Sequence, residues 1–160
     1  MRIEFVCTND VCRGPMTLSV VRTLLARSED EEMQQVLVDS CGVANYHQGE
    51  DPDPRMRKAA ATRGYELKHR ARVFDPEDVS TVDLIVAMDA QVLNTMRRLL
   101  GGDERQLAKV RMLREFESGG PMDAAVPDPY YGTDASFDQV AKLIDDCCGN
   151  LAKKLEAREI

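Results

Sequence analysis

The stretch EFVCTNDVCRGPM, Glu4–Met16, decides the fold of the amino-terminal part of this chain. A short apolar run over Ile3–Val6 predicts a strand. Pro15 suits the first turn of a helix, and apolar residues recur at helical spacing beyond it. The segment Cys7–Arg13 between them is polar and contains two cysteines, the second followed directly by an arginine. A strand that runs through such a loop into a helix is typical of an anion-binding turn.

Three further strand patterns, each followed by a helix pattern, continue along the chain. The strand patterns lie at residues 36–40, 82–88 and 109–113. The helix after the first of them begins at Pro54, with Asp53 as its N-cap, and ends near Gly64. The next helix follows a second N-cap, Asp89, and ends near Gly101.

The last helix pattern begins near Ser136, which together with Gln139 resembles a capping box. Its apolar residues recur at helical spacing and predict one buried face, made by Phe137, Val140, Ile144, Cys147 and Leu151. The complete order β-α-β-α-β-α-β-α predicts an α/β fold, an open four-stranded parallel sheet with helices on both faces. A length of 160 residues with 43% hydrophobic residues fits one domain over residues 1–160.

The composition of the chain limits the classes of molecule that it is expected to bind. The formal net charge of -7 and the isoelectric point near 4.9 disfavour nucleic acid and acidic membranes. The start MRIEFV is too short an apolar run for a signal peptide, and no stretch approaches the roughly 18 apolar residues of a membrane span. Five cysteines form an odd set, which argues against a disulfide scaffold. We therefore expect a cytoplasmic protein whose partners are small molecules or proteins.

The loop carries the chemistry. In a parallel sheet ligands bind beyond the carboxyl ends of the strands, where Cys7–Arg13 is expected to lie. Backbone N–H groups and the helix dipole would hold a phosphate-like anion there. They would also lower the pKa of the Cys7 thiol below its usual value of roughly 8.5, which gives a nucleophilic thiolate. The planar fork of Arg13 can hold two phosphoryl oxygens.

A second segment, VPDPYYG, supplies the proton donor that cleavage of a phosphoester needs. Asp128 lies there between two prolines, which stiffen the backbone around it. Tyr130 and Tyr131 follow and offer aromatic surface for an aryl leaving group. A Pro-Asp-Pro turn with partly buried tyrosines is the plainer interpretation of the same residues.

These residues resemble the low-molecular-weight protein tyrosine phosphatases, whose pattern is a strand, then V-C-x-G-N-x-C-R-S-P, with D-P-Y-Y late in the chain. The stretches SCGVANYHQGEDPDPR, HRARVFDPEDV, DLIVAMD and DPYYG also follow the family's order. The resemblance implies a phosphatase I-like three-layer sandwich that hydrolyses phosphotyrosine and other aryl phosphate monoesters without a metal or other cofactor. It implies phosphotyrosine protein substrates, and a phosphate or sulfate anion in the loop.

By resemblance, Cys7 is the nucleophile that forms a phosphocysteine intermediate, Arg13 binds the phosphoryl group, and Asp128 is the general acid that later activates water. The phosphate cradle would be the backbone of Thr8, Asn9, Asp10, Val11, Cys12 and Arg13. The aryl pocket would be walled by Tyr46, Tyr130 and Tyr131.

Three more residues have roles implied by the resemblance. Cys12 matches a second loop cysteine that can trap oxidised Cys7 as a disulfide; the plainer alternative is that Cys12 only fills space. His69 matches a histidine that supports the loop by hydrogen bonding. Asp89 is expected to cap its helix and support the loop rather than act as a second acid.

The chain departs from the family pattern at Asn9, Asp10 and Gly14, where the pattern has Gly, Asn and Ser. Asp10 can adopt the left-handed backbone that the turn needs. Its charge would oppose a thiolate or a phosphate dianion by roughly 2 to 3 kcal/mol. Gly14 removes a hydroxyl donor, a loss of about 1 kcal/mol. We expect a Cys7 pKa above the family norm and slower turnover.

Three other functions remain open on the sequence. Thiol-dependent arsenate reductases share the loop but need resolving cysteines near the loop after the third strand, and residues 75–100 contain none. Phosphoarginine phosphatases of the family have threonine at the position of Val11 and lack the paired tyrosines after the acid. A phosphate-binding or regulatory protein that has lost activity through the loop changes is the third.

Overall fold

Four parallel strands form one sheet at the centre of the computed structural model, which describes residues 1–120 and 124–160. Their order across the sheet is β2-β1-β3-β4. Their bounds are Arg2–Cys7 for β1, Leu37–Gly42 for β2, Leu84–Ala87 for β3 and Val110–Met112 for β4. The central strand β1 pairs with both β2 and β3 and delivers its last residue, Cys7, to the carboxyl edge of the sheet.

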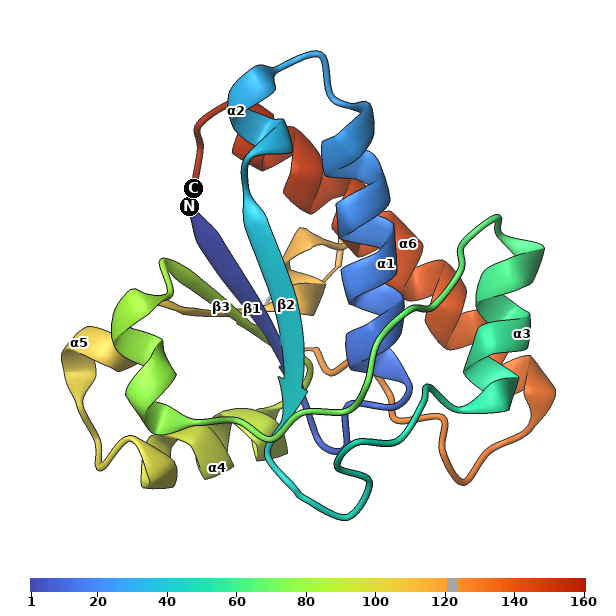
Figure 1. Ribbon diagram of the computed structural model, residues 1–160, viewed down its shortest axis with the longest axis horizontal. Coiled ribbons are helices and arrows are strands. Elements are labelled where there is room, and N and C mark those ends of the chain that lie inside the picture. The colour runs from blue at the N-terminus through green and yellow to red at the C-terminus, as the bar shows by residue number, and fades with distance from the viewer. Residues whose placement is uncertain (121–123) are drawn as a thin grey trace.

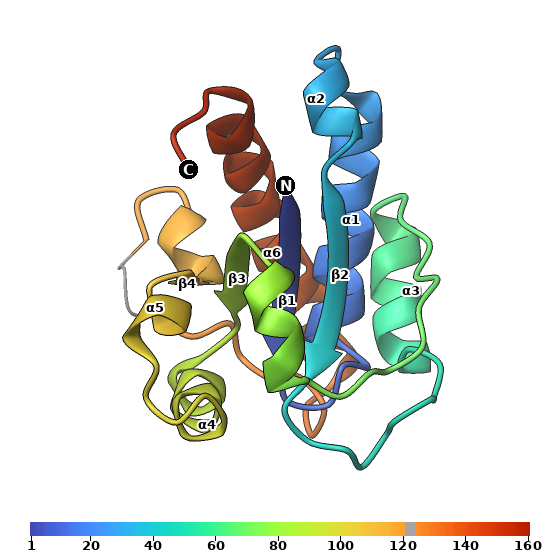
Figure 2. The same ribbon diagram turned by 60° about the vertical axis from the view of Figure 1, so that its left-hand side comes forward.

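Helices cover both faces of this sheet, as Figures 1 and 2 show, with α1, α3 and α6 on one face and α4 and α5 on the other. The α-helices span Arg13–Arg27 (α1), Glu31–Gln34 (α2), Pro54–Thr62 (α3), Ala90–Leu99 (α4), Glu104–Leu107 (α5) and Asp134–Glu156 (α6). Two 3-10 helices span Pro76–Thr81 (η1) and Leu113–Phe116 (η2). The predicted α/β class and the open parallel sheet are confirmed. The short elements α2, α5, η1 and η2 had no sequence signal that we recognised.

The two faces of β1 feed two hydrophobic cores, because successive side chains of a strand point to opposite faces. Ile3 and Phe5 are fully buried among α1 and α6. Val6 is fully buried on the other face, in the cluster that includes Ile85 and Met96. The near-continuous apolar run of the central strand follows from this double burial.

Two of the three predicted helix caps are confirmed. The Asp53 carboxylate accepts a hydrogen bond from Arg55 N at 2.8 Å, and the Asp89 carboxylate accepts one from Val92 N at 2.7 Å. The predicted final helix also buries its whole apolar stripe. Its start, however, lies upstream of Ser136.

The capping box predicted from Ser136 and Gln139 is wrong. Thr133 is the N-cap of α6, and its hydroxyl accepts from Ser136 N at 3.4 Å while Ser136 Oγ accepts from Thr133 N at 3.3 Å. A serine therefore fills the reciprocal position for which the sequence pattern expects Glu or Gln.

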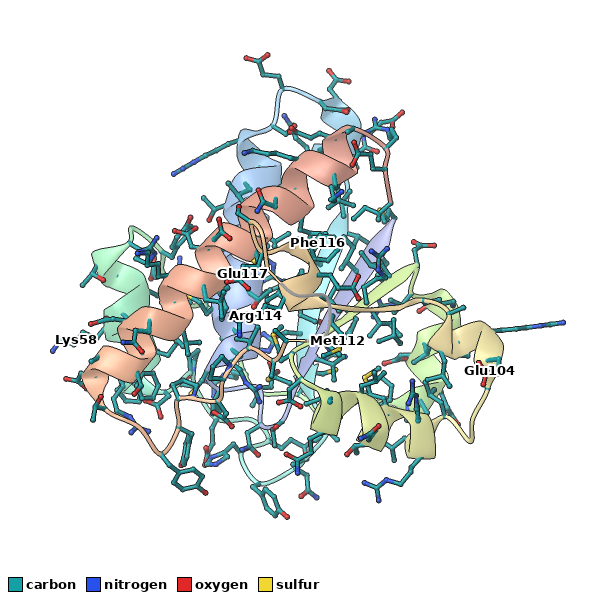
Figure 3. All side chains as sticks on the ribbon, turned by 180° about the vertical axis from the view of Figure 1, so that it is seen from behind. Lys58, Glu104, Met112, Arg114, Phe116 and Glu117 are labelled. Carbon is teal, nitrogen blue, oxygen red and sulfur yellow. The ribbon has the colours of Figure 1, made fainter. Side chains whose placement is uncertain are left out.

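In the view from behind, α6 and η2 cover this side of the molecule (Figure 3). Phe116 is buried beside α6, and its carbonyl oxygen accepts from Asn150 Nδ2 at 2.8 Å. Lys58 of α3 lies 3.8 Å from a carboxylate oxygen of Asp134 at the start of α6. The chain between η2 and α6 includes residues 121–123, which lie outside the described residues. Within the two described ranges, none of the helices has the length and apolar character needed to cross a membrane.

Gly42 closes β2 at the point where the cysteine loop passes over it. A Cβ atom at Gly42 would lie 2.6 Å from the carbonyl oxygen of Thr8 and 3.1 Å from Asn9 Cα. Both are backbone atoms, so neither can rotate away. The approach of the loop to the sheet therefore requires glycine here.

Substituting Gly42→Ala is expected to lower the unfolding free energy by about 1 to 3 kcal/mol, because the backbone must shift to admit a methyl group. Gly149→Ala is the matched control, since Gly149 lies inside α6 and a Cβ atom added there would have nothing within 4 Å. It should stabilise by up to about 1 kcal/mol. Urea denaturation of both variants measures this, and equal effects in the two would contradict the account.

Substituting Thr133→Ala should destabilise the protein by about 1 kcal/mol through loss of the N-cap of α6. Gln139→Ala, at an exposed position that makes no cap, should stay within about 0.5 kcal/mol of wild type. Thermal denaturation distinguishes the two, and a larger loss in Gln139→Ala would restore the capping box first predicted.

Candidate active site

The cysteine loop is anchored by its carbonyl oxygens. The carbonyl of Cys7 accepts from Val43 N at 3.0 Å and that of Thr8 from Ala44 N at 2.9 Å. The carbonyl of Val11 accepts from Asp53 N at 2.8 Å. In a trans peptide the next N–H points opposite to the carbonyl. The N–H groups of the following residues are therefore turned toward the inside of the loop.

Cys7 lies at the base of this loop and is almost fully buried. Its Sγ accepts a hydrogen bond from Asp10 N at 3.2 Å, and α1 begins only six residues later. Burial first, and the Asp10 carboxylate second, raise the pKa of the Cys7 thiol to about 12. Arg13 and the backbone N–H groups of Asp10 and Gly14 lower that pKa but do not outweigh burial.

The expectation that the loop holds the Cys7 pKa below its ordinary value is therefore wrong. Removal from water disfavours the thiolate more than the N–H groups and Arg13 favour it. The accompanying expectation, that the Asp10 carboxylate raises the pKa of Cys7, is confirmed, because Asp10 is the largest cause of the rise after burial.

Arg13 is buried at the start of α1 and is held on four sides. Its Nη1 donates to Asp89 Oδ2 at 2.6 Å and to the carbonyl of Val126 at 2.9 Å. Its Nη2 donates to Thr8 Oγ1 at 3.1 Å and lies 3.6 Å from Asp128 Oδ2. These contacts fix the plane of the guanidinium beside Cys7. Asp89 thus caps α4 and orients Arg13. Both contacts agree with the predicted role of Asp89 as a helix cap and a support of the loop.

Asp128 reaches the loop from the segment that precedes α6. Its side chain is 38% exposed, and its Oδ1 accepts from Tyr130 N at 3.1 Å. A small cavity that is open to solvent lies between this segment and the loop. Its lining residues are Cys7, Asn9, Asp10, Val11, Cys12, Arg13, Asp128 and Tyr130. The predicted nucleophile, arginine and acid therefore share one cavity.

The three predicted pocket tyrosines differ in position. Tyr130 lines the cavity, with the guanidinium of Arg55 5.4 Å from its ring centroid. Tyr131 packs edge-on against Tyr130 at 5.0 Å between centroids but is 95% exposed. Tyr46 is 81% exposed. Neither Tyr46 nor Tyr131 is among the residues that line the cavity.

The side chain of Asp10 is buried beneath the loop. The backbone of Asp10 has the left-handed conformation, with φ of 57°. Its Oδ1 accepts from Ser40 Oγ at 2.6 Å. Its Oδ2 lies 2.6 Å from His69 Nε2 and accepts from Arg72 N at 3.0 Å. The carboxylate therefore joins the loop to β2 and to the segment after α3, and His69 contacts the loop as the resemblance implied.

Gly14 packs closely against the Asp10 carboxylate. A Cβ atom at Gly14 would lie 2.4 Å from Asp10 Oδ1 and 3.2 Å from both Cys7 Sγ and Ser40 Oγ. A side chain at this position would therefore require the Asp10 carboxylate to shift.

The cysteines fall into two groups. Cys7 and Cys12 line the same cavity, and burial raises the pKa of both thiols. Cys41, Cys147 and Cys148 are buried elsewhere in the two cores. Across residues 1–120 and 124–160, no group of three or more His, Cys, Asp or Glu side chains is arranged to hold a metal ion.

Sequence reasoning missed Ser40 and the backbone of Arg72 as partners of Asp10. Ser40 lies in β2 at the carboxyl half of the strand, next to β1 in the sheet. That neighbour relation was a usable signal, because parallel strands end at one edge. The contact from Arg72 N had no signal in the sequence, since it depends on the path of the chain after α3.

Comparison with known proteins gives a consistent result. A family model described as low molecular weight phosphotyrosine protein phosphatase matches residues 2–159. A low molecular weight protein-tyrosine-phosphatase of Streptomyces coelicolor is 42% identical over 148 residues, which are 90% of this chain and 87% of that protein.

Solved structures agree. A protein tyrosine phosphatase from Entamoeba histolytica, with Hepes in its active site, matches with a TM-score of 0.88 and 31% identity over 100% of this chain and 99% of that one. The arginine phosphatase YwlE, in a cysteine-to-serine variant with a phosphorylated active-site serine, matches with a TM-score of 0.84 and 27% identity over 98% and 96%. The chain is a phosphatase and belongs to the low molecular weight phosphotyrosine protein phosphatase family.

Proposed function

We propose that this protein hydrolyses phosphotyrosine and related aryl phosphate monoesters through a phosphocysteine intermediate. The observation that carries the proposal is the single cavity lined by Cys7, Arg13 and Asp128, with Tyr130 at its wall. A nucleophile, a fixed cation and a carboxylic acid are the groups that such a displacement needs.

In the first step the Cys7 thiolate attacks phosphorus. The S–P bond forms and the bond from phosphorus to the phenolic oxygen breaks, while that oxygen takes the proton of the Asp128 carboxyl group. The loop N–H groups and Arg13 stabilise the charge on the equatorial oxygens. The distance of 3.6 Å between Asp128 Oδ2 and Arg13 Nη2 supports this role, because Arg13 is the residue proposed to hold the phosphoryl group.

In the second step water attacks the phosphocysteine. Asp128, now a carboxylate, takes one proton from the water, the P–S bond breaks, and inorganic phosphate leaves with Cys7 again a thiolate. The phosphorylated active-site serine of the YwlE variant supports a phosphoenzyme of this kind in a related protein. Burial and the Asp10 carboxylate raise the pKa of Cys7, and we expect turnover to be slow.

An aromatic substrate is favoured over phosphoarginine by two residues. Val11 stands where phosphoarginine phosphatases of the family have threonine, and it lines the cavity with Tyr130. An apolar side chain and an aromatic ring suit a phenyl group. The structural match to YwlE, an arginine phosphatase, makes phosphoarginine the second candidate to test.

Arsenate reduction is less well supported. It requires cysteines that resolve an intermediate on Cys7, and apart from Cys12 the other three are buried in the cores. Cys12 shares the cavity with Cys7 and is proposed as its redox partner. After a peroxide oxidises Cys7 to the sulfenic acid, the Cys12 thiol attacks the Cys7 sulfur, the disulfide forms and water leaves.

Replacing Cys7 by serine should abolish turnover of p-nitrophenyl phosphate, because the nucleophile is lost. Asp128→Asn should lower kcat on a phosphotyrosine peptide by about 10² to 10⁴. The loss should be smaller on p-nitrophenyl phosphate, whose more acidic phenol leaves with less help from an acid. Steady-state kinetics of the three proteins measure both effects.

Turnover in Cys7→Ser equal to that of wild type would favour the phosphate-binding, inactive alternative. An equal loss on both substrates would remove Asp128 from the role of general acid. Asp134→Asn, an exposed carboxylate at the start of α6, is the matched control and should leave both rates unchanged.

The wild-type kcat/KM should be higher for a phosphotyrosine peptide than for the same peptide carrying phosphoarginine. Val11→Thr should narrow that difference by introducing a hydroxyl into the cavity wall. Phosphate release measures both rates. A wild-type preference for phosphoarginine would overturn the substrate assignment while leaving the phosphocysteine chemistry intact.

A further inference from the structure

The Asp10 carboxylate is saturated with hydrogen-bond donors although its side chain is completely buried. The Ser40 hydroxyl donates to one oxygen, and the Arg72 N–H and His69 Nε2 reach the other. A carboxylate has acceptor sites for all three donors, whereas an amide has only one acceptor oxygen. The surroundings of Asp10 are therefore those of an ionised carboxylate.

His69 is the cation available to balance this charge. Its side chain is 7% exposed, and its Nε2 lies 2.6 Å from Asp10 Oδ2 and 3.2 Å from Ser40 Oγ. Its Nδ1 lies 3.9 Å from Asp39 Oδ1. Both ring nitrogens thus face carboxylates, and only the imidazolium can present N–H groups to both.

The two arginine side chains near the phosphate cradle are already paired with carboxylates. Arg13 is paired with Asp89 at 2.6 Å and approached by Asp128 at 3.6 Å. On the far side, the Arg72 guanidinium is taken by Glu4 at 3.0 Å and Asp39 at 2.8 Å.

The remaining titratable groups that the Asp10 charge affects are thiols. Cys7 accepts from Asp10 N, and the Asp10 carboxylate also raises the pKa of the buried Cys41 thiol. Both thiols gain negative charge when they ionise, so neither can balance Asp10. Of the groups around Asp10, His69 is the one whose proton offsets its charge.

We propose that Asp10 and His69 form a buried ion pair, and that anion binding in the loop depends on the positive charge of His69. Both are positioning residues, because neither touches the reacting atoms. The ion pair is neutral overall, and the loop N–H groups and Arg13 can hold a phosphate dianion. Without the charge of His69, Asp10 would leave one uncompensated negative charge beneath the cradle. The proposal rests on the proposed function for its kinetic readout only.

Four proteins test this pair: wild type, Asp10→Asn, His69→Gln and the double variant. His69→Gln keeps an N–H donor near Asp10 but removes the charge. It should weaken inorganic phosphate binding and lower kcat/KM by roughly tenfold to a hundredfold, because Asp10 is left unbalanced. Asp10→Asn in the His69→Gln background should recover most of that loss. Ser40→Ala is the matched control, since it removes a hydrogen bond to Asp10 without changing charge.

Two readouts separate this proposal from the proposed function. Protection of Cys7 from iodoacetamide by inorganic phosphate, measured at one fixed pH, requires no turnover. The kcat/KM for p-nitrophenyl phosphate at the same pH does. Both should be lower in His69→Gln than in wild type and Ser40→Ala. In Asp10→Asn, alkylation of Cys7 without phosphate should be faster at the same pH.

The decisive result is the double variant. If it is as impaired as His69→Gln, the network acts only through hydrogen bonds and the ion pair is rejected. A rate of Cys7 alkylation that is the same in wild type and Asp10→Asn also rejects it. If thermal denaturation shows that His69→Gln does not fold, the comparison of wild type with Asp10→Asn is the test. Phosphate protection in the expected order without hydrolysis of aryl phosphates would support the pair and reject the proposed phosphocysteine mechanism on these substrates.

Discussion

A buried carboxylate needs several donors to remain ionised, and the donors to Asp10 come from three separate parts of the chain. Ser40 belongs to β2, while His69 and Arg72 belong to the segment after α3. The left-handed turn of Asp10 places its own N–H against Cys7 Sγ. One side chain therefore holds the turn, the sheet edge and the nucleophile in a fixed relation.

The orientation of the Arg13 side chain depends on contacts from the β3 side of the sheet. Asp89 follows β3 and begins α4, so the strand that neighbours β1 supplies the anion that orients the guanidinium. The carbonyl of Val126 adds a second acceptor from the segment that carries Asp128. The loop is thus braced from β2 on one side and from β3 on the other, and the site lies where β1 ends between them. This is the position at which parallel sheets place their ligands.

Much of this was predictable, because the signals were local. Pro15, Asp53 and Asp89 mark helix starts by their own side chains, and the sheet follows from the alternation of strand and helix. The N-cap Thr133 was missed because its partner Ser136 is not the residue type that the pattern expects. The exposure of Tyr46 depends on a loop conformation that no local pattern encodes. The sign of the Cys7 pKa shift was missed because burial is a property of the whole fold.

The role of Asp10 is the clearest case in which tertiary contacts change the meaning of a residue. From the sequence it is a carboxylate in an anion cradle, and repulsion of the anion is the only electrostatic effect that can be inferred. In the fold its Oδ1 lies where a Cβ atom at position 14 would be 2.4 Å away, so Gly14 and Asp10 are packed against each other. The same carboxylate lies 2.6 Å from the only histidine in the described residues that contacts the loop. Repulsion is then conditional on the charge of that histidine, and a residue that opposes anion binding in isolation becomes one half of a neutral pair.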